Sequence, residues 1–494
     1  MTERRAGAIA GIMLDLRPVG YVIGLLVVAL GVAMIVPLAA DVFAQNGHWP
    51  VFAEAAIITI LTGSVTSLAC RNGVQAGLSI RQTFLLTVLV WFVLPAFGAI
   101  PLMLGPPYLD LTDAFFEAMS GLTTTGATVI SGLDDLPRGI LLWRGILQWL
   151  GGVGIIVVAM VFLPELKVGG MQIFKSEAFD TMGKILPRAA EIASRISVIY
   201  IGLTVACGIA YVATGMHPFE ALVHALTTVS TGGMATTDSS FGAYGAGAHY
   251  VAVVFMILAA LPFVRYVQLV AGNPAPLWRD SQIRAFFGTM LVIILFMTWF
   301  LLLEFHDDHE LAFRESLFNI VSIMTGTGYA SADYMEWGSF PVTAFFFIGL
   351  IGGCAGSTAC SAKIFRYQLV FASVKAQIRK LHSPHGVFVP LYQGKPVTPD
   401  IMNSVMAFFV VFITAIGVLS VLLGMTGLDF ITSVSGAATA IANIGPGLGN
   451  EIGPSGNFAG LNDTAKWILS LAMLTGRLEV LAVLTLFTFA FWRD

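Results

Sequence analysis

Four short stretches of the sequence place threonine, serine or asparagine one or two residues before glycine, between long apolar segments. They read TTTGA, STGGM, TGTGY and NIGPG in order along the chain. Glycine reaches positive-φ conformations that other residues avoid, so such turns can aim successive backbone carbonyls at one point. Carbonyl and hydroxyl oxygens arranged in this way are ligands for a cation. The candidate ligand residues are Thr124, Thr125, Gly126, Ser230, Thr231, Gly232, Gly326, Thr327, Gly328, Asn443, Ile444 and Gly445.

These stretches belong to a repeat of roughly one hundred residues that is present four times. Alignment on Gly126, Gly232, Gly328 and Gly445 gives each copy the same order: a long apolar span, a short helical segment, the glycine stretch and a second span. The short segments cannot cross a bilayer, which takes about 20 residues. Each therefore predicts a re-entrant loop. The short helices are expected at residues 113–122, 218–229, 313–324 and 429–442.

The composition indicates a protein that crosses a membrane many times. Of the 494 residues, 57% are hydrophobic and only 11% are charged, whereas soluble domains carry about 25% charged residues. We predict about ten transmembrane helices, one for each long apolar run. The runs are residues 21–38, 52–70, 83–104, 140–163, 192–214, 250–271, 285–304, 340–366, 405–424 and 467–492.

The charges predict an orientation in the cell inner (plasma) membrane. Lysine and arginine gather in the N-terminal segment and in every second loop, and acidic residues lie in the loops between. By the positive-inside rule, both termini are cytoplasmic and the re-entrant loops enter from outside. We expect no cleavable signal peptide. No nucleotide-binding or zinc-binding pattern is found in its required context, so we expect no bound cofactor, no enzyme domain and no nucleic-acid partner.

The number of spans in each repeat favours a pore. Two crossings per copy give all four copies the same orientation, whereas carriers built from inverted repeats need an odd number. Four parallel copies can surround one axis, and non-helical backbone at membrane depth is tolerated where it lines a cavity. The glycine stretches contain no acidic side chain, so they favour a dehydrated monovalent cation. A single such stretch could equally be a helix-packing patch, an alternative that four in-phase copies disfavour.

At four motifs the chain resembles the Trk/Ktr/HKT superfamily of potassium transporters. The motifs are DAFFEAMSGLTTTGAT, ILQWLGG at residues 146–152, GGCAGSTAC at residues 352–360 and NIGPGLG at residues 443–449. The resemblance covers residue 82 to the C-terminus, and the preceding helix pair, at about 20–70, is similar to the Trk-type membrane subunit. It implies an N-terminal peripheral helix pair (1–78) and four pore repeats (79–166, 186–273, 280–382 and 398–494) around a pseudo-fourfold pore.

The resemblance also implies a function and partners. All four aligned filter residues are glycine, which in this superfamily goes with potassium, so K⁺ is the expected substrate. We place it at Thr125, Thr231, Thr327 and Ile444. Members pair as homodimers and bind a cytoplasmic nucleotide-binding regulatory subunit. Transport is either passive or coupled to another ion as a symport, and the sequence leaves both open.

A gate is expected on the cytoplasmic side of the filter. The eighth run is interrupted by GGCAGSTACSAK at residues 352–363, which resembles the superfamily's intramembrane gating loop, although Cys360 and Ser361 stand where further glycines are usual. A small-residue packing face is the alternative. The candidate gate residues are Gly352, Gly353, Gly356, Ser357, Thr358, Lys363 and Arg477.

Arg477 lies within the last apolar run, where a charge on a lipid face is costly, so it should face the interior. It resembles the pore arginine of the superfamily, and a structural ion pair with Glu479 is the alternative. Lys363 either snorkels to the membrane surface or contacts the loop. Asp113 and Glu117 either cap the first short helix or concentrate cations. We interpret Arg144, Gln148 and Trp149 as anchors between pore units. A carrier for another small solute and a non-transporting scaffold or sensor remain rival functions.

Overall fold

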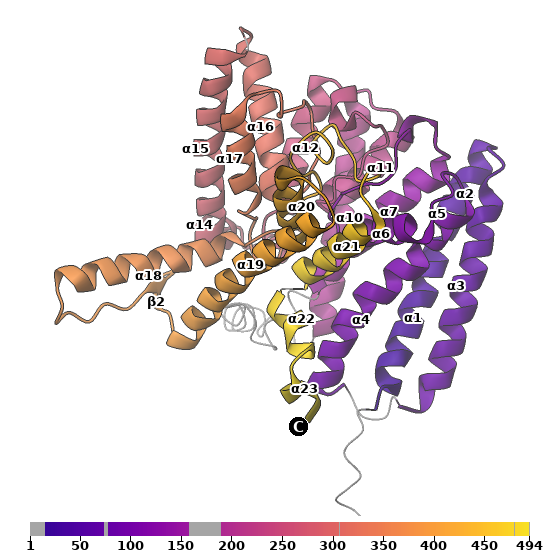
Figure 1. Ribbon diagram of the computed structural model, residues 1–494, viewed down its shortest axis with the longest axis horizontal. Coiled ribbons are helices and arrows are strands. Elements are labelled where there is room, and N and C mark those ends of the chain that lie inside the picture. The colour runs from indigo at the N-terminus through magenta and orange to yellow at the C-terminus, as the bar shows by residue number, and fades with distance from the viewer. Residues whose placement is uncertain (1–14, 74–77, 158–188, 306, 479, 494) are drawn as a thin grey trace, which may run out of the picture.

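The computed structural model describes residues 15–73, 78–157, 189–305, 307–478 and 480–493. These residues are mostly helical (Figure 1), which agrees with the prediction of an all-α polytopic membrane protein. The one pair of strands in the described ranges is a short hairpin, formed by β1 (Leu391–Tyr392) and β2 (Lys395–Pro396).

The N-terminal helix pair packs closely because glycines face each other. It consists of α1 (Arg17–Ala33), α2 (Ile35–Ala44) and α3 (Trp49–Cys70). A β-carbon at Gly24 of α1 would lie 2.8 Å from the Gly63 carbonyl oxygen of α3, so small residues permit this backbone approach. Asp41 of α2 is fully buried, and its carboxylate accepts a hydrogen bond from the Gly139 amide of repeat 1 over 2.7 Å. The pair is thereby fixed to the first repeat.

Each of the four repeats contains the predicted order of elements. Repeat 1 consists of α4 (Ile80–Gly98), α5 (Ile100–Leu104), the short helix α6 (Leu111–Leu122) and α7 (Arg138–Val157). Repeat 2 consists of α10 (Ala189–Ala213), the short helix α11 (Pro218–Val229), α12 (Ala246–Ala259) and α13 (Phe263–Val270). After α14 (Ala275–Arg279), repeat 3 consists of α15 (Ser281–Glu304), the short helix α16 (His309–Thr325), α17 (Ser339–Gly349) and α18 (Ile364–His382). Repeat 4 consists of α19 (Pro399–Met425), the short helix α20 (Phe430–Ala442), α21 (Asp463–Arg477) and α22 (Val480–Leu486), and α23 (Phe489–Arg493) follows.

Several of the ten predicted spans are not continuous helices. Within the described ranges, seven helical segments are long and apolar enough to cross a membrane, or eight if α12 and α13 count as one span bent by 89°. Pro262 stands at that bend and lacks the N–H that would continue the helix. The run at 340–366 is divided into α17 and α18, and the run at 467–492 into α21, α22 and α23. The second half of repeats 2, 3 and 4 is therefore broken at its middle.

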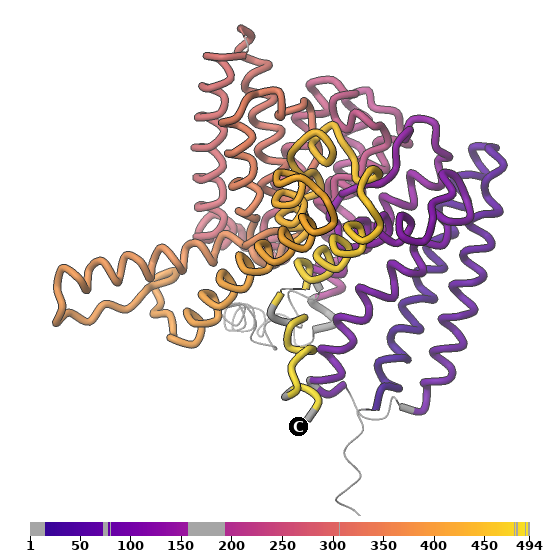
Figure 2. The backbone as a smooth tube through the Cα atoms, viewed as in Figure 1, coloured from indigo at the N-terminus to yellow at the C-terminus, as the bar shows by residue number. Residues whose placement is uncertain are grey.

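Burial separates interior helices from those facing lipid. The apolar window of α7 is 78% buried within the protein, whereas that of α19 is 17% buried. An apolar helix that leaves most of its surface exposed is suited to contact hydrocarbon. Figure 2 shows α18 and the start of α19 running together away from the rest of the molecule, joined by the hairpin. The interior position of α7 makes it the helix best placed to support the glycine stretches.

Candidate cation pathway

The four glycine stretches share one backbone shape at the ends of the short helices. The first shared position has a left-handed conformation, at Thr124 (φ 52°), Thr231 (φ 52°), Gly326 (φ 76°) and Asn443 (φ 51°). The second donates its N–H to a carbonyl of the preceding short helix over 2.8–3.1 Å, at Thr125, Gly232, Thr327 and Ile444. The third is a glycine with positive φ, at Gly126 (88°), Gly233 (77°), Gly328 (83°) and Gly445 (109°). The repeat in the sequence is thus also a repeat in the backbone.

These third-position glycines close the four stretches into a ring. A β-carbon at Gly126 would overlap the carbonyl oxygen of Gly232 in the second stretch. In the same way, a β-carbon at Gly233 would overlap the carbonyl oxygen of Thr327, and one at Gly328 would overlap the carbonyl oxygen of Ile444. At Gly445 an added β-carbon would lie 2.8 Å from the oxygen of Thr125, in the first stretch. Each glycine therefore abuts the second-position carbonyl of the next repeat, and the last repeat returns to the first.

The backbone corrects the alignment of the second stretch by one residue. We predicted that Gly232 matches Gly126 and that Thr231 matches Thr125, but the equivalent residues are Gly233 and Gly232. The stretch STGGM contains two consecutive glycines, and residue types alone do not say which of them takes the positive-φ position. Thr231 instead matches Thr124.

The hydroxyl groups of the stretches bond to one another and to nearby backbone. Thr123 and Thr125 are joined through their hydroxyls over 2.8 Å, and Asn443 Nδ2 donates to Thr125 Oγ1 over 2.9 Å. Ser230 Oγ donates to the Thr227 carbonyl over 3.1 Å, and Thr231 Oγ1 donates to the Ser230 carbonyl over 2.7 Å. Through these contacts the hydroxyls support the backbone of the stretches.

A cavity opens onto one side of the ring. We call it the vestibule; its volume is about 220 Å³, and it is lined by all four third-position glycines. Asp238 and Arg144 also line it. Asp238 accepts hydrogen bonds from the Gly132 and Leu133 amides over 2.8 and 3.1 Å, so its carboxylate joins the loops of repeats 1 and 2.

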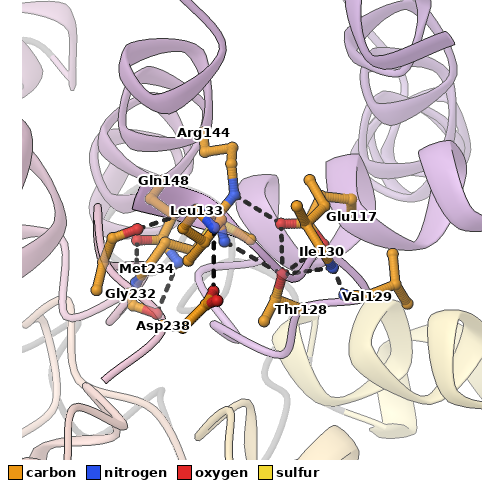
Figure 3. A network of polar contacts seen from close by, with 11 residues as sticks. Glu117, Thr128, Val129, Ile130, Leu133, Arg144, Gln148, Gly232, Met234 and Asp238 are labelled. Carbon is orange, nitrogen blue, oxygen red and sulfur yellow. Dashed lines mark hydrogen bonds and ion pairs between the residues drawn. The ribbon is translucent and has the colours of Figure 1, made fainter. Parts of the chain in front are cut away.

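Arg144 of α7 holds the first two stretches in place. Figure 3 shows its side chain bonded to both Glu117 and Thr128, with Nε 2.7 Å from Glu117 Oε1 and Nη2 3.2 Å from Thr128 Oγ1. Nη1 donates to the Ala235 carbonyl of repeat 2 over 2.9 Å. Both members of this ion pair are buried. Glu117 also accepts from the Val129 amide over 2.9 Å, so it acts as a support of the first stretch.

Gln148, one turn further along α7, contacts the ring itself. Its Nε2 donates to the Gly232 carbonyl over 2.6 Å, and its Oε1 accepts from the Met234 amide over 3.1 Å (Figure 3). These contacts match the interpretation of Arg144 and Gln148 as anchors between pore units. Asp113 pairs with Lys466 of repeat 4 over 2.5 Å, and the N-cap of α6 is Asp110.

On the other side of the ring lies a smaller cavity of about 50 Å³, which we call the lower cavity. Its lining includes Cys360, Lys363, Asn443 and Arg477. Arg477 ends α21 and is 5% exposed, and its Nη1 donates to Cys360 Sγ over 2.9 Å. The prediction that Arg477 faces the interior therefore agrees with its burial. Glu479, its alternative partner, lies outside the described residues.

The segment between α17 and α18 folds under the ring as an irregular loop. Gly352 N donates to the Ala362 carbonyl over 2.8 Å, and this closes the base of the loop. Ser357 Oγ donates to the Cys354 carbonyl over 2.6 Å within the loop. Further contacts join the loop to α12 and α13: Thr358 Oγ1 to the Ala259 carbonyl (3.0 Å), Cys354 N to the Ala260 carbonyl (3.1 Å) and Phe263 N to the Gly356 carbonyl (2.9 Å).

Six of the seven predicted gate residues fall into two groups by position, and the seventh, Thr358, bonds to the end of α12. Gly356 and Ser357 line the lower cavity together with Lys363 and Arg477, and Lys363 Nζ donates to the Ala359 carbonyl of the loop. The contact with the loop that we considered for Lys363 is therefore present. Gly352 and Gly353 lie at the base, where a β-carbon would meet the Cys360 carbonyl and the Ala359 side chain, respectively.

Sequence reasoning noted Cys360 as a departure from the loop motif but gave it no role. Its sulfur lies 3.7 Å from Thr124 Oγ1, and the two residues are separated by 236 positions in the chain. The signal that points to Cys360 is its place in the loop motif, at a position where the resemblance led us to expect glycine.

Comparisons with known proteins agree with this arrangement. A family model described as TrkH, cation transport protein, matches residues 48–492. The Trk system potassium uptake protein TrkI of Halomonas elongata is 42% identical, over 97% of each chain. The Trk system potassium uptake protein TrkH of Escherichia coli is 35% identical, over 97% of this chain and 99% of its own length. The crystal structure of the potassium transporter TrkH from Vibrio parahaemolyticus superimposes with a TM-score of 0.89, at 34% identity, over 97% of this chain and 100% of that chain.

Proposed function

Because the chain belongs to the TrkH family of cation transport proteins, we propose that it takes up potassium across the membrane through a pore formed by its four repeats. The observation that carries this proposal is the closed ring, in which each positive-φ glycine abuts a carbonyl oxygen of the next repeat. A ring of carbonyl oxygens replaces the hydration shell of a monovalent cation.

Potassium reaches the ring from the vestibule and exchanges water for backbone oxygens. The second-position carbonyls of Thr125, Gly232, Thr327 and Ile444 form one layer of ligands, with Gly232 in the place first given to Thr231. The short helices end at the ring, and each helix C-terminus carries about half a negative charge. Four such ends favour a cation below the ring without a carboxylate in the stretches, and this suits a monovalent ion.

The loop at residues 350–363 and Arg477 form the gate. The loop lies under the ring, and the lower cavity holds only about 50 Å³, so the arrangement described here is closed. The Arg477 charge opposes a cation that leaves the ring in this direction. Withdrawal of the loop opens the path, and the glycines at 352, 353 and 356 allow the backbone to move.

The remaining parts of the proposal concern assembly and orientation. We place the lower cavity toward the cytoplasm and the vestibule outside, in the cell inner membrane, as the distribution of basic residues favours. The projecting α18–α19 pair exposes Phe371, Ile378 and Leu381, which suits contact with a second copy in a homodimer. A cytoplasmic nucleotide-binding regulatory subunit completes the assembly.

A flux measurement on the purified protein tests the function. We expect liposomes containing the protein to accumulate radioactive rubidium, with potassium competing far better than sodium. Comparing uptake with and without a proton or sodium gradient distinguishes passive from coupled transport. Absence of cation flux from well-folded protein would refute the proposal, and equal competition by sodium would refute the selectivity assigned to the ring.

A further inference from the structure

Cys360 contacts the glycine stretches of two different repeats. Its sulfur is 3.7 Å from Thr124 Oγ1 of repeat 1, and a β-carbon added at Gly326 of repeat 3 would lie 2.9 Å from the Cys360 Cβ. The ring joins repeats 1, 2, 3 and 4 in that order, so repeats 1 and 3 face each other across the axis. A residue that contacts both at once must fill the space between them.

The thiol of Cys360 lies beside hydrogen-bond donors that could bind a negatively charged group. Arg477 Nη1 donates to Cys360 Sγ, but Arg477 Nε and Nη2 are buried and have no hydrogen-bond partner among the residues that the structure describes. Arg477 and Cys360 line the same lower cavity of about 50 Å³, which is room for a few water molecules at about 10–15 Å³ each. Unused guanidinium donors beside a cavity favour an anion that can accept charge-assisted hydrogen bonds.

We propose that Cys360 closes the ion path and is a modification site for small anionic thiol reagents, whose adduct keeps the gate from closing. This rests on the proposed function. The closed arrangement leaves no room for an added group between Thr124 and Gly326, so the reaction takes place while the loop is withdrawn. Once attached, the adduct prevents Cys360 from returning to the axis. Arg477 belongs to α21 rather than to the loop, and its free donors attract the anionic reagent.

The chemical step is a thiol exchange with a thiosulfonate. Cys360 loses its proton to water, and the thiolate attacks the sulfenyl sulfur of 2-sulfonatoethyl methanethiosulfonate. A disulfide bond forms between Cys360 and the sulfonatoethylthio group, the sulfur–sulfur bond of the reagent breaks, and methanesulfinate leaves. No oxidant is needed, and dithiothreitol reverses the reaction.

The experiment uses the full chain in liposomes, with rubidium efflux measured before and after treatment. We expect the anionic thiosulfonate to raise efflux, the increase to persist after the reagent is removed, and dithiothreitol to restore the first rate. Mass spectrometry should find the adduct on the peptide that contains Cys360. The matched control is Cys360→Ser, for which the treated and untreated rates should be equal. Its elution in size-exclusion chromatography shows whether it is folded.

Arg477 is tested with a cationic reagent of similar size, the 2-trimethylammonioethyl thiosulfonate. The wild type should react faster with the anionic reagent, relative to the rates of both reagents with a free thiol, and Arg477→Lys should keep this preference while Arg477→Ala loses it. An adduct on Cys360 that leaves efflux unchanged or lowers it would overturn the proposal. So would the absence of an adduct, or equal stimulation of Cys360→Ser. Failure of the untreated protein to conduct rubidium would instead count against the proposed function.

Discussion

Replacement of Gly233 by alanine tests the ring at the position where the backbone differs from the sequence alignment. At φ 77° an L-residue is strained by about 1–2 kcal/mol, and the added β-carbon would overlap the Thr327 carbonyl oxygen. The overlap is relieved when that carbonyl turns away from its place in the ring, so potassium loses a ligand. If the whole strain energy is lost from the binding free energy of potassium, 1–2 kcal/mol corresponds to roughly 5- to 30-fold weaker binding.

Gly232→Ala is the matched comparison in the neighbouring residue. Gly232 does not have a positive φ, and its added β-carbon would meet the side-chain amide of Gln148. That amide is the end of a flexible side chain, which can shift more easily than backbone. Gly215→Ala controls for strain alone, because Gly215 has a φ of 92° with open space around it and lies outside the ring.

Rubidium uptake at increasing concentrations, with and without sodium, measures both affinity and selectivity. We expect Gly233→Ala to raise the half-saturating concentration by roughly 5- to 30-fold and to strengthen sodium competition. Gly232→Ala should have a smaller effect, and Gly215→Ala should leave both quantities near wild type. A larger defect in Gly232→Ala than in Gly233→Ala, with both proteins folded, would refute the corrected alignment.

Three further substitutions address the gate and the supports of the ring. Arg477→Ala should increase rubidium flux several-fold because it removes the positive charge below the ring; slower or unchanged flux from folded protein would contradict the gate. Glu117→Ala leaves Arg144 buried without its carboxylate and should destabilise the protein by about 3–5 kcal/mol, and a thermal unfolding midpoint equal to wild type would count against this. Ser361→Gly removes a left-handed φ of 60° and also the 2.6 Å bond to the Gly349 carbonyl. These effects on stability are each about 1 kcal/mol and nearly cancel, so the melting temperature should change little while flux rises as the loop loosens. A fall in flux would contradict this assignment.

The repeat and its short helices could be predicted from the sequence because they depend on local properties. The lengths of the apolar runs and the recurring pairs of threonine and glycine place the short helices within a few residues of their positions. The observed α6 and α20 begin at Leu111 and Phe430, next to predicted starts at 113 and 429. Local properties are not sufficient in STGGM, where two glycines are adjacent. Which of Gly232 and Gly233 takes the positive-φ position depends on a contact with Thr327 in another repeat.

The breaks in the spans and the environment of Cys360 depend on tertiary structure. Hydropathy registers the apolar run around Pro262 as one segment, whereas the chain bends there by 89° and exposes backbone groups to which the loop binds. Cys360 gains its partners from residues 117 and 236 positions away. No local pattern contains such distances, so the thiol looked like an ordinary buried cysteine until the repeats were assembled.

The ring also has a direction. Each glycine rests on an oxygen supplied by the next repeat around the ring, in the order 1, 2, 3, 4 and back to 1. A substitution at the glycine of one repeat should consequently displace the carbonyl of the next repeat around the ring and leave the glycine of the preceding repeat unaffected. The effects of paired substitutions at the glycines of adjacent repeats should then depart from additivity, because the two sites share a contact.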